Sequence, residues 1–271
     1  MKKIALVGVA LLLTIASVGC NSSNKENTAT TETGETKELT VFAAASMTET
    51  LEEIKTKYEE ENDVKILYTF DSSGTLKTQI DEGANCDIFI SAAQKQMNAL
   101  DPEKGEVEGS SPIDSETRID LLENKVTLAV TEGNPKDIKA FDEIGTEKVE
   151  SIALGNSDVP VGQYSEELFT NLGIWDDIQP KVTYGSNVKE VTTWVSEGVV
   201  DCGVIYATDA YSAGLEVVAE ADDSMLENKV IYPGAILENS ENKEEAQKFL
   251  EYLQGEEASK IFESVGFAPV N

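Results

Sequence analysis

The stretch LTVFAAASMTETLEEIKTKYEEE, residues 39–61, passes from a strand-like apolar run directly into a helical pattern. Leu39–Ala44 is short and mostly apolar, as expected for a buried strand. Over Thr48–Glu61, apolar residues recur at spacings of three and four, which places them on one face of a helix. Ser46, followed three residues later by Glu49, matches a capping box and predicts that the helix begins at this turn.

The same alternation of strand-like and helix-like runs continues along the chain. It predicts an α/β fold with parallel or mostly parallel sheets covered by helices on both faces. Residues 101–118 interrupt the rhythm with Pro102, Gly105 and Pro112, so we expect a loop there and a crossing into a second lobe soon after. The predicted strands are Leu39–Ala44, Val64–Phe70, Asp87–Ser91, Val126–Thr131, Ser151–Leu154, Lys181–Tyr184, Cys202–Tyr206 and Val230–Leu237, and the predicted helices are Thr48–Glu61, Glu166–Leu172, Lys189–Glu197 and Lys243–Leu253.

Small polar residues occupy four strand-to-helix corners: Ser46, residues 71–75 (Asp-Ser-Ser-Gly-Thr), residues 155–162 and residues 185–188. In a parallel sheet such corners share the carboxyl edge, where open α/β folds bind ligands. Each helix start offers unpaired N–H groups and a partial positive charge, and small residues let an anion approach closely. The corners contain no Lys, Arg or His. Together they predict an anion site built from neutral donors, although a single such corner is usually only a helix cap or a turn.

The chain is strongly acidic and contains no histidine. Asp and Glu number 51 against 21 Lys and Arg, a formal net charge of −30, which argues against nucleic acid and anionic lipid as partners. The absence of His excludes Ser-His-Asp, Cys-His and His-ligated metal chemistry. Gly-x-Ser-x-Gly, Walker A and Gly-x-Gly-x-x-Gly motifs are absent as well. We therefore expect no enzyme, no cofactor and no site for a free metal cation.

The N-terminus has the pattern of a secreted, lipidated protein. Lys2 and Lys3 precede an apolar run too short to span a bilayer comfortably, so residues 1–19 are interpreted as a signal peptide. Cys20 resembles the lipidated cysteine of a bacterial lipobox, with Ser17 where that motif prefers Leu; an ordinary signal peptide with an incidental cysteine is the alternative. Residues 20–37 have almost nothing to bury and predict a flexible linker. We expect attachment to the extracellular face of the cell membrane through this lipid alone.

Two further cysteines, Cys86 and Cys202, each stand just before or at the start of a strand-like run. Outside the cell they could form a disulfide. The alternating topology places them in different lobes, where a disulfide would lock a hinge that needs to move. We therefore expect two buried free thiols.

The corners and their surroundings resemble the periplasmic molybdate-binding protein family, nearly throughout residues 38–271. Five motifs carry the resemblance, and their order and spacing make it highly specific. They are Leu39–Thr48; Phe70–Leu76 continuing through Gln79-Ile80, Gly83-Ala84 and Asp87–Ala92 to Gln94; Val159–Tyr164; Gly203–Ala210; and Tyr232-Pro233.

The resemblance implies a two-lobe α/β fold of the periplasmic-binding-protein type (type II), with the ligand cleft between the lobes. Lobe one would comprise residues 38–118 plus 236–271, and lobe two residues 119–235. The proteobacterial pattern of the family has Ser where Gly74 stands and Ala where Val161 stands; neither departure removes a backbone donor. A carboxylate at Asp71 would repel a dianion, so we expect it to point outward. The ligand-binding residues implied are Ser46 and Ser73 through hydroxyl and N–H groups, Val161 and Val188 through N–H groups, and Tyr206 through its hydroxyl.

The function implied is that of a solute-binding protein, a monomer that captures molybdate or tungstate and delivers it to an ABC transporter permease. Such oxyanions are fully deprotonated at neutral pH and only accept hydrogen bonds, which suits a shell of donors. Sulfate or another tetrahedral oxyanion is the alternative within this class. A non-catalytic surface lipoprotein or a hydrolase is the alternative outside it.

Overall fold

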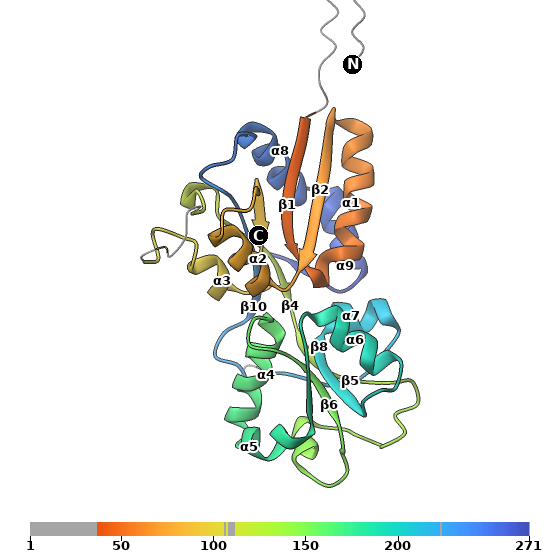
Figure 1. The fold of residues 1–271 in the computed structure, drawn as a ribbon. Helices are drawn as coiled ribbons and strands as arrows, with labels where there is room; N and C mark the ends of the chain where they lie inside the picture. Colours follow the sequence, from red (N-terminus) through yellow and green to blue (C-terminus); the bar gives the residue numbers. More distant parts are fainter. Residues whose placement is uncertain (1–36, 106, 108–111, 223, 271) are drawn as a thin grey trace, which may run out of the picture. The chain divides into compact units, whose positions relative to one another are not determined.

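A computed structural model describes residues 37–105, 107, 112–222 and 224–270. The predicted signal peptide, Cys20 and nearly all of the predicted linker lie outside the described residues. Within the described part, the chain forms two β-sheets with helices packed against them (Figure 1). This confirms the predicted α/β fold and its two-lobe arrangement.

The first sheet has six strands in the order β11-β4-β10-β3-β1-β2. β1 runs parallel to β2 and β3, whereas β10 is antiparallel to β3 and β4, and β11 is antiparallel to β4. The predicted parallel arrangement therefore holds only for the N-terminal part, because the chain returns from the second sheet through β10 in the opposite direction. The strands are β1 (Lys37–Ala44), β2 (Val64–Asp71), β3 (Ile88–Ile90), β4 (Ile119–Asn124), β10 (Val230–Ile236) and β11 (Ala268–Pro269).

The second sheet has five strands in the order β7-β6-β8-β5-β9. β6 is parallel to β7 and β8, and β5 is antiparallel to β8 and β9, so this sheet is mixed as well. Ligand-facing corners are thus expected at the carboxyl ends of β6, β7 and β8. The strands are β5 (Val126–Val130), β6 (Ile152–Gly155), β7 (Val182–Gly185), β8 (Cys202–Tyr206) and β9 (Glu216–Glu220).

The helices bury the faces that the sequence spacing predicted. Leu51, Ile54 and Tyr58 of α1 are all buried, and the Tyr58 ring packs edge-on against Phe249 and Tyr252, with centroids 4.9 Å apart in both pairs. Burying one such side chain stabilises the fold by about 1.5–3 kcal/mol. The α-helices are α1 (Thr48–Glu61), α2 (Ser73–Asp81), α3 (Gln94–Asn98), α4 (Pro160–Asn171), α5 (Trp175–Ile178), α6 (Val188–Ser196), α7 (Ala207–Ala213), α8 (Lys243–Leu253) and α9 (Glu256–Ser264), and the 3₁₀ turns are η1 (Ala45–Met47), η2 (Ser115–Thr117), η3 (Phe141–Gly145) and η4 (Gln179–Lys181).

The chain crosses between the sheets twice, at Lys125 between β4 and β5 and over residues 221–229 between β9 and β10. We call the part around the first sheet lobe one and the part around the second sheet lobe two. The predicted boundaries placed residues 119–235 in lobe two, but β4 and β10 pair with each other inside the first sheet. β4 and β10 therefore belong to lobe one, because their hydrogen bonds continue its sheet. The first crossing comes after β4 and the second comes before β10, so lobe two is shorter by about one strand at each end than predicted.

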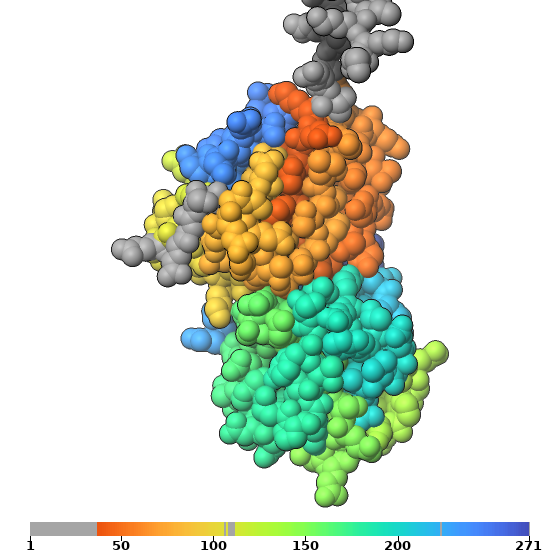
Figure 2. Space-filling view, viewed as in Figure 1, coloured from red at the N-terminus to blue at the C-terminus, as the bar shows by residue number. Residues whose placement is uncertain are grey.

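Several contacts hold the lobes against one another, and Figure 2 shows the two halves meeting along a seam. The Gly74 N–H, at the start of α2 in lobe one, donates to the Asp158 carbonyl of lobe two at 2.9 Å. A Cβ at position 74 would lie 2.4 Å from that carbonyl oxygen, so only glycine fits this approach. Gln96 donates to Gln163 at 3.2 Å elsewhere along the seam. The structure is therefore that of a closed pair of lobes.

Both internal cysteines are buried free thiols, which confirms the prediction. Cys86 precedes β3 in lobe one, and Cys202 begins β8 in lobe two. Burial raises the pKa of both thiols, that of Cys202 to about 12, so neither is a reactive thiolate at neutral pH.

Candidate functional site

The first corner carries Ser46 on the short 3₁₀ turn η1, between β1 and α1. The predicted capping box is wrong, because the residue that caps α1 is Met47 and no side chain makes a capping hydrogen bond there. The extra turn moves Ser46 away from the capping position. Its buried hydroxyl is instead 2.9 Å from the Tyr232 hydroxyl, in hydrogen-bonding contact.

The second corner carries Ser73 as the first residue of α2. Ser72 is the cap, since its hydroxyl accepts from the Thr75 N–H at 3.1 Å. The Ser73 side chain is thereby free to face inward, where it is fully buried and accepts a hydrogen bond from the Ala92 N–H at 2.9 Å. A hydroxyl that already accepts still has its own proton to donate, so Ser73 is prepared as a donor.

Asp71 carries a carboxylate that would repel a dianion if it lined the site. This carboxylate forms a hydrogen bond with the backbone. One oxygen accepts from the Ser72 N–H at 2.7 Å. Within the described residues it makes no hydrogen bond to Ser46, Ser73 or Tyr206. Whether the rest of the carboxylate points outward stays a prediction.

The third and fourth corners offer backbone donors from lobe two. Val161 is the second residue of α4, after Pro160, and Val188 is the first residue of α6, after the capping residue Asn187. Both valines are buried. Their N–H groups lie in the first helical turn, which has no intrahelical acceptor, and they donate to no acceptor in the described part of the chain. They are oriented donors backed by the helix dipoles.

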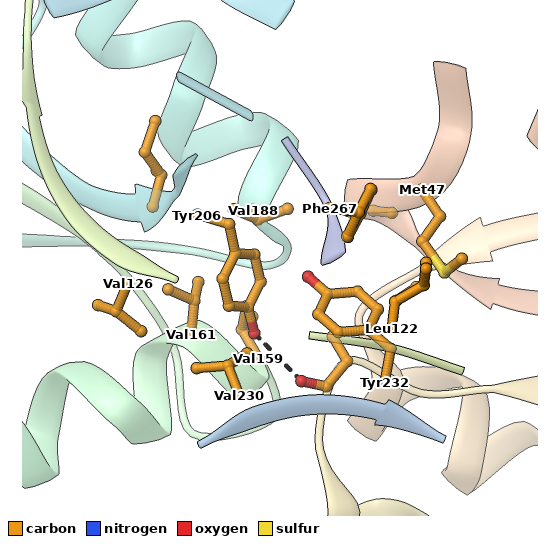
Figure 3. Packing of buried hydrophobic residues seen from close by; sticks show 14 of the residues in the cluster. Met47, Leu122, Val126, Val159, Val161, Val188, Tyr206, Val230, Tyr232 and Phe267 are labelled. Atoms are coloured by element: carbon orange, nitrogen blue, oxygen red, sulfur yellow. Dashed lines mark hydrogen bonds between the residues drawn. The ribbon is translucent and has the colours of Figure 1, made fainter. Parts of the chain in front are cut away.

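Two buried tyrosines lie at the centre of this region (Figure 3). The rings of Tyr206, at the end of β8, and Tyr232, in β10, pack edge-on with centroids 5.6 Å apart. Burial raises the pKa of both phenols well above the ordinary value, so both keep their protons at neutral pH. The Tyr206 hydroxyl donates to the Ala92 carbonyl at 3.4 Å, a length at which a hydrogen bond is weak. This proton can therefore turn to a stronger acceptor.

Shared partners bring the predicted residues together. Ala92 is contacted by both Ser73 and Tyr206, and Tyr232 is contacted by both Ser46 and Tyr206. Val161 and Val188 belong to the same buried cluster as Tyr206 and are drawn beside its ring in Figure 3. Ser46, Ser73 and Tyr206 are thus linked to one another, and the role of all five residues as ligands stays a prediction.

The lysine nearest to Val188 in the sequence has its positive charge paired with carboxylates of the protein. Lys189 directly follows Val188, but its ammonium pairs with Glu49 at 2.6 Å and with Asp209 at 3.1 Å. Burial raises the pKa of Asp209 to about 6, although the Lys189 charge opposes the shift. Neither Asp209 oxygen makes a well-aligned hydrogen bond to any described residue, so the ion pair is its main compensation. What remains to meet a ligand is a set of neutral donors.

Two residues of this network were missed as site residues from the sequence. The sequence pattern indicates Tyr232 only as part of the Tyr232-Pro233 motif, and it gives no indication of Asn124, which donates to Tyr232 at 3.2 Å. A tyrosine within an apolar run was a usable signal for the first, because a buried phenol needs a hydrogen-bond partner. Nothing in the local sequence marked Asn124, whose partners are distant along the chain.

The described residues contain no group of three or more Cys, Asp or Glu side chains arranged to hold a metal ion. Among the described helices, none is both long and apolar enough to cross a membrane.

Comparisons with known proteins identify the family of the chain. The family model of bacterial extracellular solute-binding proteins matches residues 39–268. Over 98% of both chains, the sequence is 34% identical to YvgL of Bacillus subtilis, named a putative ABC transporter substrate-binding lipoprotein. It is also 34% identical to the molybdate-binding protein ModA of Escherichia coli, over 84% of this chain and 88% of that one.

The fold is matched by a solved structure as well. The periplasmic molybdate-binding protein of Azotobacter vinelandii superposes with a TM-score of 0.74 at 20% identity, over 86% of this chain and all of that one. At this identity the likeness shows the fold alone. The family match and the two relatives place the chain among the bacterial extracellular solute-binding proteins of ABC transporters.

Proposed function

We propose that this protein captures molybdate or tungstate between its lobes and delivers it to an ABC transporter permease. The observation that carries the proposal is that Ser46, Ser73 and Tyr206 are linked through the shared partners Tyr232 and Ala92, while the Val161 and Val188 N–H groups at two helix starts of lobe two have no acceptor among the described residues. Relatives named for molybdate binding support the ligand class.

The donor set suits a fully deprotonated oxyanion. The Ser73 hydroxyl oxygen already accepts a hydrogen bond from the Ala92 N–H group, and its own proton can still be donated to a ligand. The Val161 and Val188 N–H groups can only donate. Such a shell pairs well with four acceptor oxygens and poorly with a protonated phosphate, which would need an acceptor in return.

Sulfate is the alternative, since it has the same charge and shape in a smaller body. A rigid shell spaced for the larger oxyanion would leave donors unpaired around sulfate, at a cost of about 1–3 kcal/mol for each group. Molybdate and tungstate are too alike in size and charge for this shell to separate them, and the proposal therefore covers both.

The formal charge of −30 does not oppose this proposal. Aligned N–H groups act on the ligand at contact distance, whereas surface carboxylates are screened over about 8 Å at physiological ionic strength. We expect the surface charge to slow the capture of a dianion more than it weakens the bound state.

Closure over the ligand is proposed to couple capture to delivery. The Gly74–Asp158 hydrogen bond and the Glu49–Lys189 ion pair both join lobe one to lobe two. An anion bound by donors of both lobes favours the closed form, because only that form brings the donors together. The closed form is then the one that the permease recognises, and no catalytic step is proposed.

The proposed location is the extracellular face of the cell membrane, with Cys20 carrying the lipid and residues 20–37 acting as a flexible tether. The lipoprotein name of the Bacillus relative supports this assignment. Cys20→Ala should release the protein from the membrane fraction into the medium. Continued membrane attachment of that variant would contradict the assignment.

Calorimetric titration tests the ligand. The chain lacking residues 1–36, which retains every described strand and helix, would be titrated with molybdate, tungstate, sulfate and phosphate. We expect tight one-to-one binding of the first two, much weaker binding of sulfate and none of phosphate. Tightest binding of sulfate would select the alternative, and binding of none of the four would reject the proposal.

A further inference from the structure

We propose that Asn124 and Tyr232 are positioning residues that turn the Ser46 hydroxyl proton towards the bound oxyanion. This inference rests on the proposed function. It assigns a role to two buried residues that would not themselves be ligands, and it follows from the direction of one hydrogen-bond chain.

The chain consists of four side chains from both lobes. The Asn124 amide nitrogen, at the end of β4, donates to the Thr208 hydroxyl of α7 at 2.9 Å and to the Tyr232 hydroxyl at 3.2 Å. The Tyr232 hydroxyl in turn lies 2.9 Å from the Ser46 hydroxyl. All four side chains belong to buried residues, none more than 5% exposed.

A backbone contact fixes the direction of the Asn124–Tyr232 link in this series of hydrogen bonds. The Asn124 side-chain oxygen accepts from the Lys125 N–H at 2.8 Å, which orients the amide so that its nitrogen faces the two hydroxyls. A side-chain amide nitrogen can only donate. The Tyr232 oxygen must therefore act as the acceptor of this hydrogen bond, while its own single proton remains available.

The Ser46 oxygen, 2.9 Å away, is an acceptor for that phenol proton, and the Tyr206 hydroxyl is a second hydrogen-bonding neighbour of Tyr232. Burial keeps the proton in place, because it raises the pKa of Tyr232 well above the ordinary phenol value. If Tyr232 donates to Ser46, the Ser46 oxygen is an acceptor within the protein. Its own proton is then left for the ligand, just as the Ala92 N–H leaves the Ser73 proton for the ligand.

Reversing the direction of these hydrogen bonds should lower the affinity for the oxyanion more than removing the Tyr232 hydroxyl does. In Asn124→Asp, a carboxylate still accepts from the Lys125 N–H, but its second oxygen can no longer donate to Tyr232. The Tyr232 proton then turns to the carboxylate, Ser46 donates to Tyr232, and a lone pair of Ser46 faces the dianion. Tyr232→Phe merely removes the link, so Ser46 can still turn its proton to the ligand.

The test compares molybdate affinities at pH 8 by calorimetry, using the chain without residues 1–36. We expect losses of about 100-fold for Asn124→Asp and about 10-fold for Tyr232→Phe. The double variant Asn124→Asp/Tyr232→Phe should bind more tightly than Asn124→Asp alone, because no tyrosine is left to reverse Ser46. A purely repulsive effect of the new charge would persist undiminished in the double variant.

Matched controls separate this chain from general changes. Asn171→Asp adds the same charge at an exposed position of α4, and Tyr211→Phe removes an exposed phenol of α7. Both should bind like the wild type. Lowering the pH from 8 to 6 should restore part of the affinity of Asn124→Asp relative to the wild type, since a protonated carboxyl can donate again. A packing defect would not respond to pH in this way.

Three results would overturn the inference while leaving the proposed function intact: Asn124→Asp binding like Asn171→Asp, the double variant binding no better than Asn124→Asp, or a loss that pH does not change. If Asn124→Asp does not fold, Ser46→Ala carries the test instead. Ser46→Ala should cost less affinity in a Tyr232→Phe background than in the wild type, and equal costs would overturn the inference. Failure of the wild type to bind molybdate or tungstate would overturn the proposed function itself.

Discussion

Lobe one and lobe two contribute different chemical groups to the proposed site. Lobe one supplies the side-chain hydroxyls of Ser46 and Ser73, whereas lobe two supplies the backbone N–H groups of Val161 and Val188 together with the Tyr206 hydroxyl. A hydroxyl can be removed by one substitution without touching the helix that carries it. A backbone donor survives almost every substitution. The two halves should therefore differ in how they respond to mutation, and this difference can be measured.

Truncation of both lobe-one serines should have the largest effect. Ser46→Ala with Ser73→Ala removes two hydrogen bonds to a charged ligand, each worth about 1.5–3 kcal/mol, so affinity for molybdate should fall by about a thousandfold or more. Circular dichroism and thermal unfolding should remain close to the wild type. Unchanged affinity measured by calorimetry would discredit the site.

The contact between the lobes comes next in size. Gly74→Ala places a methyl group where the Asp158 carbonyl lies in the closed form, at 2.4 Å. Closure should be impeded and affinity should fall by about 100-fold, because the donors of lobe two no longer reach the ligand. Small-angle scattering should show that molybdate no longer compacts the variant as it compacts the wild type.

The same substitution should not weaken the ligand-free protein. Position 74 lies inside α2, where alanine is favoured over glycine by roughly 1 kcal/mol in the helical state. Gly145→Ala, in lobe two with its nearest side-chain atom at 3.4 Å, is the matched control and should close normally. Wild-type closure of Gly74→Ala would show that the Gly74–Asp158 contact is not required.

The lobe-two donors offer a sharper version of the comparison. Val188 is the first residue of α6, where proline is well tolerated, and Asn187 before it is already extended at φ −154° and ψ 171°. Val188→Pro removes the N–H group and should lower affinity by about 10- to 100-fold. Val188→Ala keeps the N–H group and should change affinity by only a few-fold. Equal losses in both variants would indicate that the side chain, rather than the backbone donor, is what the site uses.

Much of the fold could be predicted from the sequence. The spacing of apolar residues gave the bounds of α1 and α8 as the structure has them, and most strands to within a residue or two. β4 was missed because charged residues interrupt its sequence, Ile-Asp-Leu-Leu-Glu-Asn. β9 and β11 are short edge strands whose definition comes from pairing with distant partners. Missing β4 also displaced the predicted crossing between the lobes.

The site was predictable as a set of corners but not as a network. Small residues directly after predicted strands indicated where backbone and hydroxyl donors would lie. This pattern can be read from the sequence because it involves only neighbouring residues. The use of each hydroxyl is set by packing: Ser46 meets Tyr232, 186 residues away in the sequence, instead of capping its own helix. Asn124 has no local signature for the same reason, since its partners Thr208 and Tyr232 lie 84 and 108 residues away.

The two lobes also differ in how a buried carboxylate affects the dependence of stability on pH. In lobe one, burial of Asp101 is outweighed by hydrogen bonds from Ser115 and Arg118, so its pKa is lowered. In lobe two, burial of Asp209 prevails over Lys189, and its pKa rises to about 6 from 3.8. The lowered pKa of Asp101 stabilises the folded state at pH values above the ordinary pKa of an aspartate, and this stabilisation is lost as the pH falls. The raised pKa of Asp209 costs stability above pH 6, and this cost is relieved as the pH falls towards 4.

Asp209→Asn should therefore change how stability depends on pH while Asp101 is left in place. Between pH 6 and 4 the folded wild type binds more protons at Asp209 than the unfolded chain does, so this residue contributes a slope of decreasing stability with rising pH. The variant lacks that slope. As the pH falls from 6 to 4, the free energy of unfolding of the wild type should increase by about 2 kcal/mol relative to that of the variant, as urea titrations at each pH would measure. A parallel course of the two curves would mean that Lys189 fully compensates the buried charge, and that lobe two tolerates its carboxylate as easily as lobe one does.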